Sequence, residues 1–160
     1  MKGLLSNVIV LVNGAESSIS AVKYAIALQR AYGSAVTAVY VVDTHTIRQL
    51  ALSRIFVDDE SEEYERSLAE TGRRYLAFAG ELARVKGATI ERRLLSGSIA
   101  GEVVRAAEDL AADGIILGGW ERGSVFRDLL AEENKEIART ARCSVLIVRG
   151  SAAEEAYRSL

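Results

Sequence analysis

The sequence of 160 residues contains no proline, one cysteine and one histidine. Because Cys143 is the single thiol, the chain cannot form an internal disulfide, which is typical of a reduced, intracellular compartment. Basic residues do not outnumber acidic ones, since the formal net charge is −2 and Lys and Arg are scattered along the chain. We therefore expect no nucleic-acid interface and no membrane-binding basic patch.

Long apolar runs are also missing. No window approaches the ~20 apolar residues of a membrane span. The N-terminal apolar stretch is interrupted by Ser6, Asn7 and Asn13, and it is too short for a signal peptide. We therefore predict a cytoplasmic protein without a membrane segment. Without proline, turns depend on Gly, Asn, Asp and Ser, and helices continue without kinks.

The hydrophobic fraction of 49% and the charged fraction of 26% are ordinary for a globular domain. We expect one domain over residues 1–150 and a polar, Ala-rich C-terminal tail over residues 151–160. No internal repeat or linker divides the chain.

Short apolar runs rich in β-branched residues alternate with amphipathic segments, and this alternation predicts an α/β fold. The predicted strands are residues 8–12, 35–42, 89–95, 115–117 and 144–148. The predicted helices are residues 16–32, 62–86, 99–110 and about 132–141. Residues 44–59 are expected to form a flexible or partly helical excursion. Strands that are apolar at every position are buried on both faces, so we predict an open five-stranded parallel sheet with helices on both faces.

The loops that follow the strands carry little catalytic chemistry. Residues 13–18, after the first strand, match neither a dinucleotide-binding glycine pattern nor a Walker A motif. We interpret His45 as an exposed loop residue rather than a ligand contact, and Cys143 as a small buried residue rather than a reactive thiol. No second His or Cys completes a metal site, and no nucleophile elbow is present. We name no catalytic residue and favour a protein that is not an enzyme.

Four segments together carry a family resemblance: residues 8–16, 38–43, 112–118 and 143–149. In this order, with a Leu-Leu loop before the last, they resemble the universal stress protein family over nearly the whole chain. The resemblance implies a single domain with strand order 3-2-1-4-5. It also implies a nucleotide site at the C-terminal ends of the strands.

Members of that family that bind ATP carry a spaced signature of Gly, Gly and then Gly followed by Ser or Thr. At the matching positions this sequence has Gly118, Glu121, Ala131 and Glu132, so only the first residue is retained. The family's Asp at the end of the first strand is Asn13 here. The positions that match the family's nucleotide site are Val12, Asn13, Gly14, Val41, Leu117, Gly118, Trp120, Glu121, Arg122, Ala131, Glu132 and Glu133.

The acidic replacements predict a closed phosphate site. If the last helix begins near Glu132, then Glu132 and Glu133 lie in its first turn, where a phosphate would otherwise bind. We therefore expect weak or no ATP binding and assign no cofactor. ATP or AMP binding through Arg122 and Arg127 is the alternative. For Trp120 we favour packing of its loop over stacking on a base.

The last predicted strand bears on assembly. It is apolar and carries no charge that would discourage pairing. In the family this strand pairs with its counterpart in a second subunit, and the resemblance implies a twofold homodimer through Ser144, Val145, Leu146, Ile147, Val148 and Arg149. We predict a small stress-response or regulatory protein that acts through the homodimer and an unknown protein partner. The alternative is an ATP/AMP-binding switch or slow ATPase with an altered phosphate loop.

Overall fold

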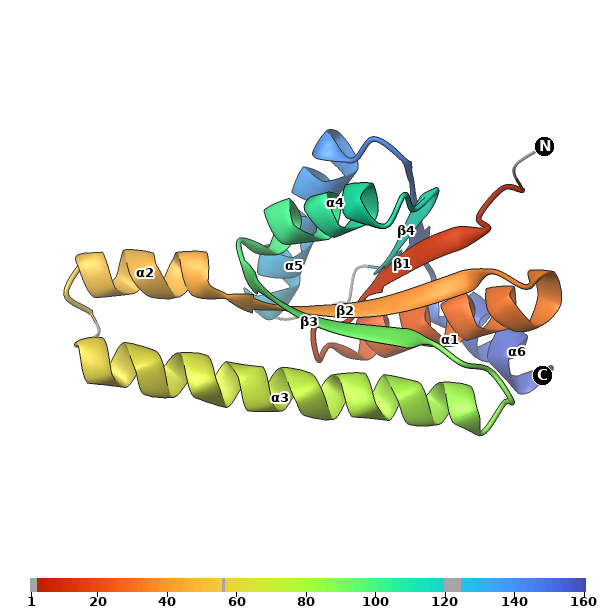
Figure 1. Ribbon diagram of the computed structural model, residues 1–160, viewed down its shortest axis with the longest axis horizontal. Helices are drawn as coiled ribbons and strands as arrows, with labels where there is room; N and C mark the ends of the chain where they lie inside the picture. The colour runs from red at the N-terminus through yellow and green to blue at the C-terminus, as the bar shows by residue number, and fades with distance from the viewer. Residues whose placement is uncertain (1–2, 56, 120–124) are drawn as a thin grey trace.

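A computed structural model describes residues 3–55, 57–119 and 125–160, without the side chains of residues 125–131. Its centre is a five-stranded sheet in the order β3-β2-β1-β4-β5, with every pairing parallel (Figure 1). The strands are β1 (Asn7–Leu11), β2 (Ala35–Asp43), β3 (Glu91–Gly97), β4 (Gly114–Gly118) and β5 (Ser144–Val148). The predicted fold class and strand order are confirmed.

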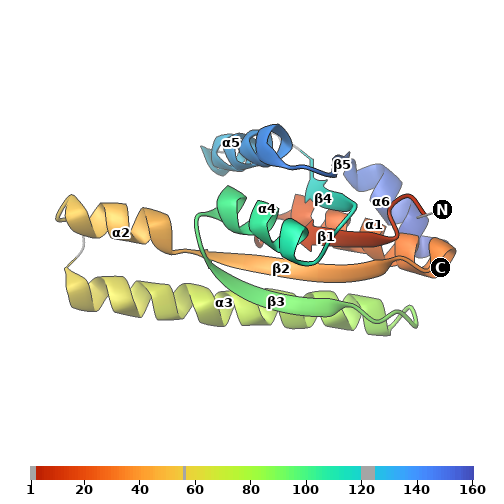
Figure 2. The ribbon, with the colours of Figure 1, turned by 45° about the horizontal axis from the view of Figure 1, so that its top comes forward.

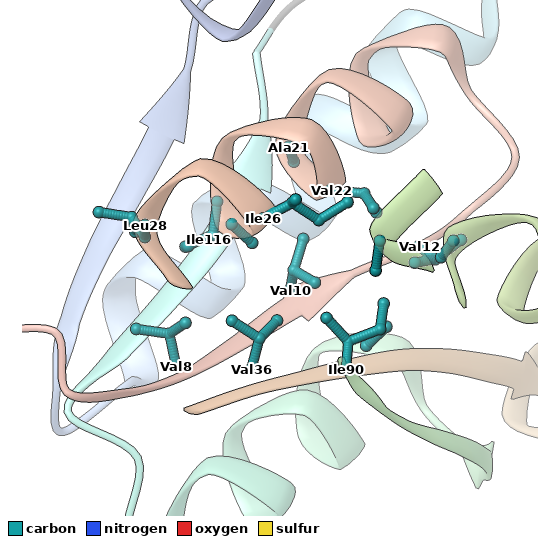
Figure 3. Close-up of a cluster of buried hydrophobic side chains, with 14 of the residues drawn as sticks. Val8, Val10, Val12, Ala21, Val22, Ile26, Leu28, Val36, Ile90 and Ile116 are labelled. Carbon is teal, nitrogen blue, oxygen red and sulfur yellow. The ribbon is translucent and has the colours of Figure 1, made fainter. Parts of the chain in front are cut away.

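Strand β1 lies at the centre of the sheet and is buried on both faces. Val8 and Val10 belong to one core cluster, whereas Ile9 and Leu11 belong to the other. Figure 3 shows the first of these clusters, in which the β1 valines face helix α1 (Glu16–Tyr32). Side chains alternate between the faces of a strand, so an uninterrupted apolar run is needed to fill both cores.

Helices cover the sheet in two layers (Figure 2). The α1 layer also contains α3 (Asp58–Arg84) and α6 (Gly150–Arg158). The opposite layer contains α4 (Ile99–Asp109) and α5 (Val125–Thr140), which contribute Val103 and Ile137 to the second core. The prediction of helices on both faces is confirmed.

Residues 44–59 contain a helix of their own. Helix α2 (Thr44–Leu52) follows β2 directly, packs against α3 and projects with the start of α3 past the end of the sheet (Figure 1). Asp43 caps α2 by accepting hydrogen bonds from the backbone N–H and the hydroxyl of Thr46. The predicted partly helical excursion is therefore a helical hairpin.

Several predicted helix boundaries were wrong. Helix α3 begins at Asp58 rather than at residue 62, because its acidic run belongs to the first turn, where carboxylates interact favourably with the helix dipole. Helix α5 begins at Val125 rather than near residue 132. Residues 151–160, expected to be a polar tail, instead lie mostly within α6.

Helix α6 packs on the domain through buried Ala153 and Tyr157 and through an ion pair. Tyr157 is 8% exposed, and its hydroxyl donates a 2.8 Å hydrogen bond to the carbonyl oxygen of Leu82. The Nζ atoms of Lys86 and Lys23 lie 4.8 and 5.4 Å from the centre of its ring, within the range of cation–π attraction. Lys23 also pairs with Glu154. These contacts explain why a mostly polar segment packs as a helix.

Replacing Tyr157 by Ala should lower the free energy of unfolding by about 3 kcal/mol, because a buried aromatic ring is removed. Tyr157→Phe should cost about 1 kcal/mol, the usual net value of one hydrogen bond. Urea denaturation followed by circular dichroism measures both. Tyr32 is 80% exposed, so Tyr32→Ala is the control and should stay within about 0.5 kcal/mol of wild type. Equal effects at the two positions would contradict the packing of α6.

Candidate functional site

The candidate site lies at the C-terminal edge of the sheet, where the chain leaves β1 and β4 toward opposite faces. Strand β1 leads into α1, and β4 leads toward α5 in the other layer. Open parallel sheets bind ligands at this topological switch point. The structure therefore brings Asn13, Gly14 and Gly118, all predicted site residues, to one edge of the sheet.

The loop after β1 is held together by its own side chains. The Oδ1 atom of Asn13 accepts a 3.1 Å hydrogen bond from the backbone N–H of Ala15. The Ser18 hydroxyl donates to the Ala15 carbonyl oxygen at 2.9 Å. Asn13 therefore stabilises a tight turn into α1, a role that Asn side chains commonly fill. Val12, which precedes it, is completely buried.

An aromatic ring packs against this loop. Gly14 has φ +82°, and a Cβ atom on it would lie 2.8 Å from the ring of Tyr75. Tyr75 comes from α3 and stacks on Tyr40, with ring centres 6.3 Å apart. Nothing in the local sequence of either residue indicates that Tyr75 meets Gly14. Both the backbone angle and the ring require glycine here.

The end of β4 is closely packed on two sides. A Cβ atom on Gly118 would lie 2.5 Å from the carbonyl carbon and oxygen of Ser17, at the start of α1. The Nδ2 atom of Asn134, which is 6% exposed, donates a 3.0 Å hydrogen bond to the Gly118 carbonyl oxygen. Leu117 is fully buried. The one glycine retained from the ATP signature is therefore also required by packing.

The two predicted anion-blocking glutamates do not lie in the first turn of a helix. Since α5 begins at Val125, Glu132 and Glu133 lie about two turns inside it, and the predicted interaction with its N-terminal dipole was wrong. Glu132 is exposed and forms a 3.0 Å ion pair with Lys135. Arg127 and Ala131 lie in α5, although their side chains are not described. Trp120, Glu121 and Arg122 lie outside the described residues.

Glu133 instead reaches the first turn of a different helix. Its half-buried carboxylate lies near the backbone N–H of Ala100, at the start of α4, and this N–H favours its charged form. Burial raises the pKa of Glu133, and the nearby carboxylate of Asp43, at the end of β2, raises this pKa further. The N–H of Ala100 acts in the opposite direction. Val41, the predicted adenine contact, is 7% exposed and belongs to the adjacent core cluster.

Two further candidate residues, His45 and Cys143, do not belong to the group of residues around Glu133. His45 is exposed on α2, where its Nε2 atom lies 3.2 Å from Nε2 of Gln49. Cys143 is half-buried, and burial raises the pKa of its thiol.

Within the described part of the chain, no three His, Cys, Asp or Glu side chains are grouped to hold a metal ion. No described helix is both long and apolar enough to cross a bilayer.

Comparison with known proteins gives consistent results. The universal stress protein family model matches residues 5–149. The universal stress protein MJ0531 of Methanocaldococcus jannaschii is 28% identical over 148 residues, which cover 92% of this chain and 84% of the relative. A solved universal stress family protein from Burkholderia pseudomallei superposes with a TM-score of 0.70 at 23% identity, covering 92% and 98% of the two chains. The universal stress protein from Archaeoglobus fulgidus, solved in complex with dAMP, superposes with a TM-score of 0.59 at 17% identity. The match covers 91% of this chain and 98% of that protein.

Gly118→Ala should destabilise the protein by about 1–3 kcal/mol, because the new methyl group would overlap backbone atoms that cannot move independently. Urea denaturation is the measurement. Gly3 is the matched control, since a Cβ atom there would make only an ordinary contact with Ser6, at 3.7 Å. Gly3→Ala should change stability by less than about 0.5 kcal/mol. A Gly118→Ala variant as stable as wild type would refute the close approach to Ser17.

Glu133→Gln should become more stable relative to wild type as the pH rises from about 4 to about 7. The folded state raises the pKa of Glu133 above its ordinary value of 4.5, so the folded protein holds this proton longer than the unfolded chain does. Ionisation of Glu133 therefore lowers the stability of the wild-type protein as the pH rises. The uncharged amide of the Gln variant does not ionise, and its oxygen can still lie against the N–H of Ala100. Urea denaturation at several pH values tests this. Exposed Glu132→Gln is the control, and equal pH profiles for the two variants would contradict the argument.

Proposed function

Because the chain belongs to the universal stress protein family, we propose that it is a cytoplasmic stress-response or regulatory protein that works by protein interaction. In this proposal it binds ATP weakly or not at all. The observation that carries the proposal is the position of Glu133. Its carboxylate lies near the start of α4, at the edge of the sheet, where the charge of Asp43 disfavours its ionisation.

The electrostatics of this edge oppose a triphosphate. Asp43 and Glu133 lie on the same face of the sheet as Val41. Val41 is the position that matches the family's adenine contact. A like charge at 4–6 Å costs on the order of 1 kcal/mol or more at intermediate dielectric. Two carboxylates would therefore weaken nucleotide binding about tenfold or more, at ~1.4 kcal/mol per decade. The N–H of Ala100 lies near the Glu133 carboxylate and favours its charge, so an external anion at this helix start would meet a like charge.

The exposed edge of the sheet supports the second part of the proposal. Strand β5 is an outermost strand, and its three central residues, Val145, Leu146 and Ile147, are only half-buried. An apolar edge strand of this kind readily pairs with another chain. We propose a twofold homodimer formed by Ser144–Val148, with Arg149 at the margin of the interface.

The projecting hairpin supports an interaction role as well. Leu52, Ile55 and Val57, near the turn between α2 and α3, are 84%, 63% and 62% exposed. Large apolar side chains grouped on an exposed turn are common at protein-interaction sites. An unidentified protein partner is therefore part of the proposal.

The alternative function is a nucleotide-binding switch or slow ATPase. It is favoured by one specific comparison, the solved relative from Archaeoglobus fulgidus in complex with dAMP. In this alternative, AMP or ATP occupies the edge beside Val41 with Glu133 displaced from Ala100. The two functions predict opposite responses to added nucleotide.

Wild-type protein in about 5 mM Mg-ATP or AMP should show a Tm within about 1 °C of the nucleotide-free value. A ligand at 100 times its Kd would raise the free energy of unfolding by ~2.7 kcal/mol. That corresponds to a rise in Tm of roughly 5–10 °C for a domain of this size. Asp43→Asn with Glu133→Gln removes both charges and leaves an amide oxygen at position 43 to accept from the Thr46 N–H, so ATP should bind about tenfold tighter or more.

Differential scanning fluorimetry and isothermal titration calorimetry measure these two effects. Glu132→Gln is the charge-matched control and should leave nucleotide binding unchanged. A large Tm increase in the wild-type protein would favour the switch. A folded double variant with no gain in ATP affinity would show that these carboxylates are not what prevents binding.

The wild-type protein should elute at twice the 17.3 kDa chain mass in light-scattering chromatography. Val145→Lys with Ile147→Lys should convert it to monomers, because charges on an edge strand oppose pairing. Ser151→Lys with Ser159→Lys adds the same charge to α6 and should leave the dimer intact. A monomeric wild-type protein would eliminate the proposed dimer.

A further inference from the structure

Helix α3 carries a row of apolar side chains that its packing on the sheet leaves exposed. Val57 at its N-cap, Tyr64, Phe78 and Val85 at its C-cap are 62%, 44%, 48% and 56% exposed. The face that α3 buries is a separate one, formed by Gly72, Leu76, Ala79 and Ala83. In both overall views α3 lies along the lower margin of the molecule (Figures 1 and 2). Large exposed apolar side chains on one helix indicate an interaction surface.

These exposed residues recur at every seventh position. Partly buried Thr71 completes the series, and we call Val57, Tyr64, Thr71, Phe78 and Val85 the α3 stripe. A seven-residue apolar repeat keeps side chains on one side of a helix, and it is the pattern with which one helix packs along another. The ends of the stripe are 28 residues apart, or about 42 Å at 1.5 Å per residue. The pattern therefore favours a second long helix as the partner.

The stripe has the same kinds of residue on both sides of its centre. Counted outward from Thr71, Tyr64 and Phe78 form the first pair, and Val57 and Val85 form the second. A twofold axis through Thr71 would place Tyr64 of one copy against Phe78 of the other, and Val57 against Val85. An interface between identical chains on a twofold axis must be self-complementary in this way. The symmetry therefore favours a second copy of this chain.

The charges on α3 support the same arrangement. Residues 57–70 contain seven acidic residues and one arginine, whereas residues 72–85 contain three arginines and one glutamate. Exposed Arg73 and Arg74 carry the positive charge of the second half, because Arg84 is paired with Glu81 in the same helix. In an antiparallel pair, the acidic half of each helix lies along the basic half of the other. In a parallel pair like charges would meet, which is unfavourable.

We propose that the α3 stripe binds a second copy of this chain in an antiparallel helix pair centred on Thr71. Helix α3 packs on β2 and β3, at the opposite side of the sheet from β5, so this contact is independent of the β5 dimer and of nucleotide binding. Of the exposed apolar residues at the turn between α2 and α3, only Val57 belongs to it. Exposed ion pairs contribute little, so we expect a Kd on the order of 0.1–1 mM. The β5 dimer therefore remains the main species at micromolar concentration.

Sedimentation velocity on the Val145→Lys/Ile147→Lys variant isolates the α3 contact, because this variant lacks the β5 contact. We expect its mean mass to rise from that of a monomer at about 0.01 mM toward that of a dimer at about 1 mM. Adding Tyr64→Gln with Phe78→Gln should weaken association about tenfold or more. Leu4→Gln is the control, since Leu4 is 96% exposed beside β5, and it should leave the Kd unchanged. Raising NaCl from about 20 to about 500 mM should weaken association about threefold, because ion pairs are screened.

Cysteine cross-linking tests the orientation of the two helices. With Cys143→Ala in the same variant, Thr71→Cys should form a disulfide between two copies under mild oxidation. Val57→Cys alone should not cross-link, since the two copies of this residue would lie about 42 Å apart. A mixture of Val57→Cys and Val85→Cys proteins should cross-link. Cross-linking of Val57→Cys with itself would indicate a parallel pair and would overturn the proposal.

Two results overturn the α3 contact itself. One is a folded Val145→Lys/Ile147→Lys variant that is still monomeric at about 1 mM. The other is a folded Tyr64→Gln/Phe78→Gln variant that associates as its parent does. If the β5 substitutions prevent folding, wild type is the test: its mean mass at about 1 mM should exceed twice the chain mass, and Tyr64→Gln/Phe78→Gln should reduce it to twice. Failure of the β5 dimer is distinguishable, because wild type would then be monomeric at about 0.01 mM and would still associate through α3.

Discussion

The burial of β1 between two parallel neighbours is the constraint on which the rest of the structure depends. Val8 and Val10 fill one core, and Ile9 and Leu11 fill the other, so the sheet must be covered on both faces. Because β1 pairs with β2 on one side and β4 on the other, the chain must reverse its winding direction at this strand. That reversal brings the start of α1 against the end of β4, where Gly118 meets Ser17.

The electrostatics at this edge of the sheet depend on which groups lie against the free backbone N–H groups at the helix N-termini. At the start of α4, a carboxylate of the same chain, that of Glu133, lies near the backbone N–H of Ala100. Burial and the neighbouring Asp43 disfavour this charge, yet the N–H of Ala100 helps to retain it. An internal anion at this position competes with any external anion for the same donor.

The starts of α1 and α6 lie close together on the other face of the sheet, with the Ser20 hydroxyl oxygen 3.4 Å from the Cβ position of Gly150. Helix α6 is held there by Tyr157, whose hydroxyl binds the carbonyl oxygen of Leu82 on α3. The addition of one short helix after β5 thus encloses a polar cavity on the α1 side of the sheet.

The sequence alone determined the fold class, the five strands and the family, because apolar runs and amphipathic periodicity are local patterns that burial on two faces requires. It predicted that Glu132 and Glu133 lie in the first turn of the last helix, but the structure places them about two turns inside α5. That depended on where α5 begins and on its packing against α4, which no local pattern encodes. Tyr75 against Gly14, and Ser20 facing Gly150, likewise join residues far apart in the chain. Only the tertiary structure decided these contacts, because they depend on how separate helices pack on the sheet and not on the preferences of any one segment.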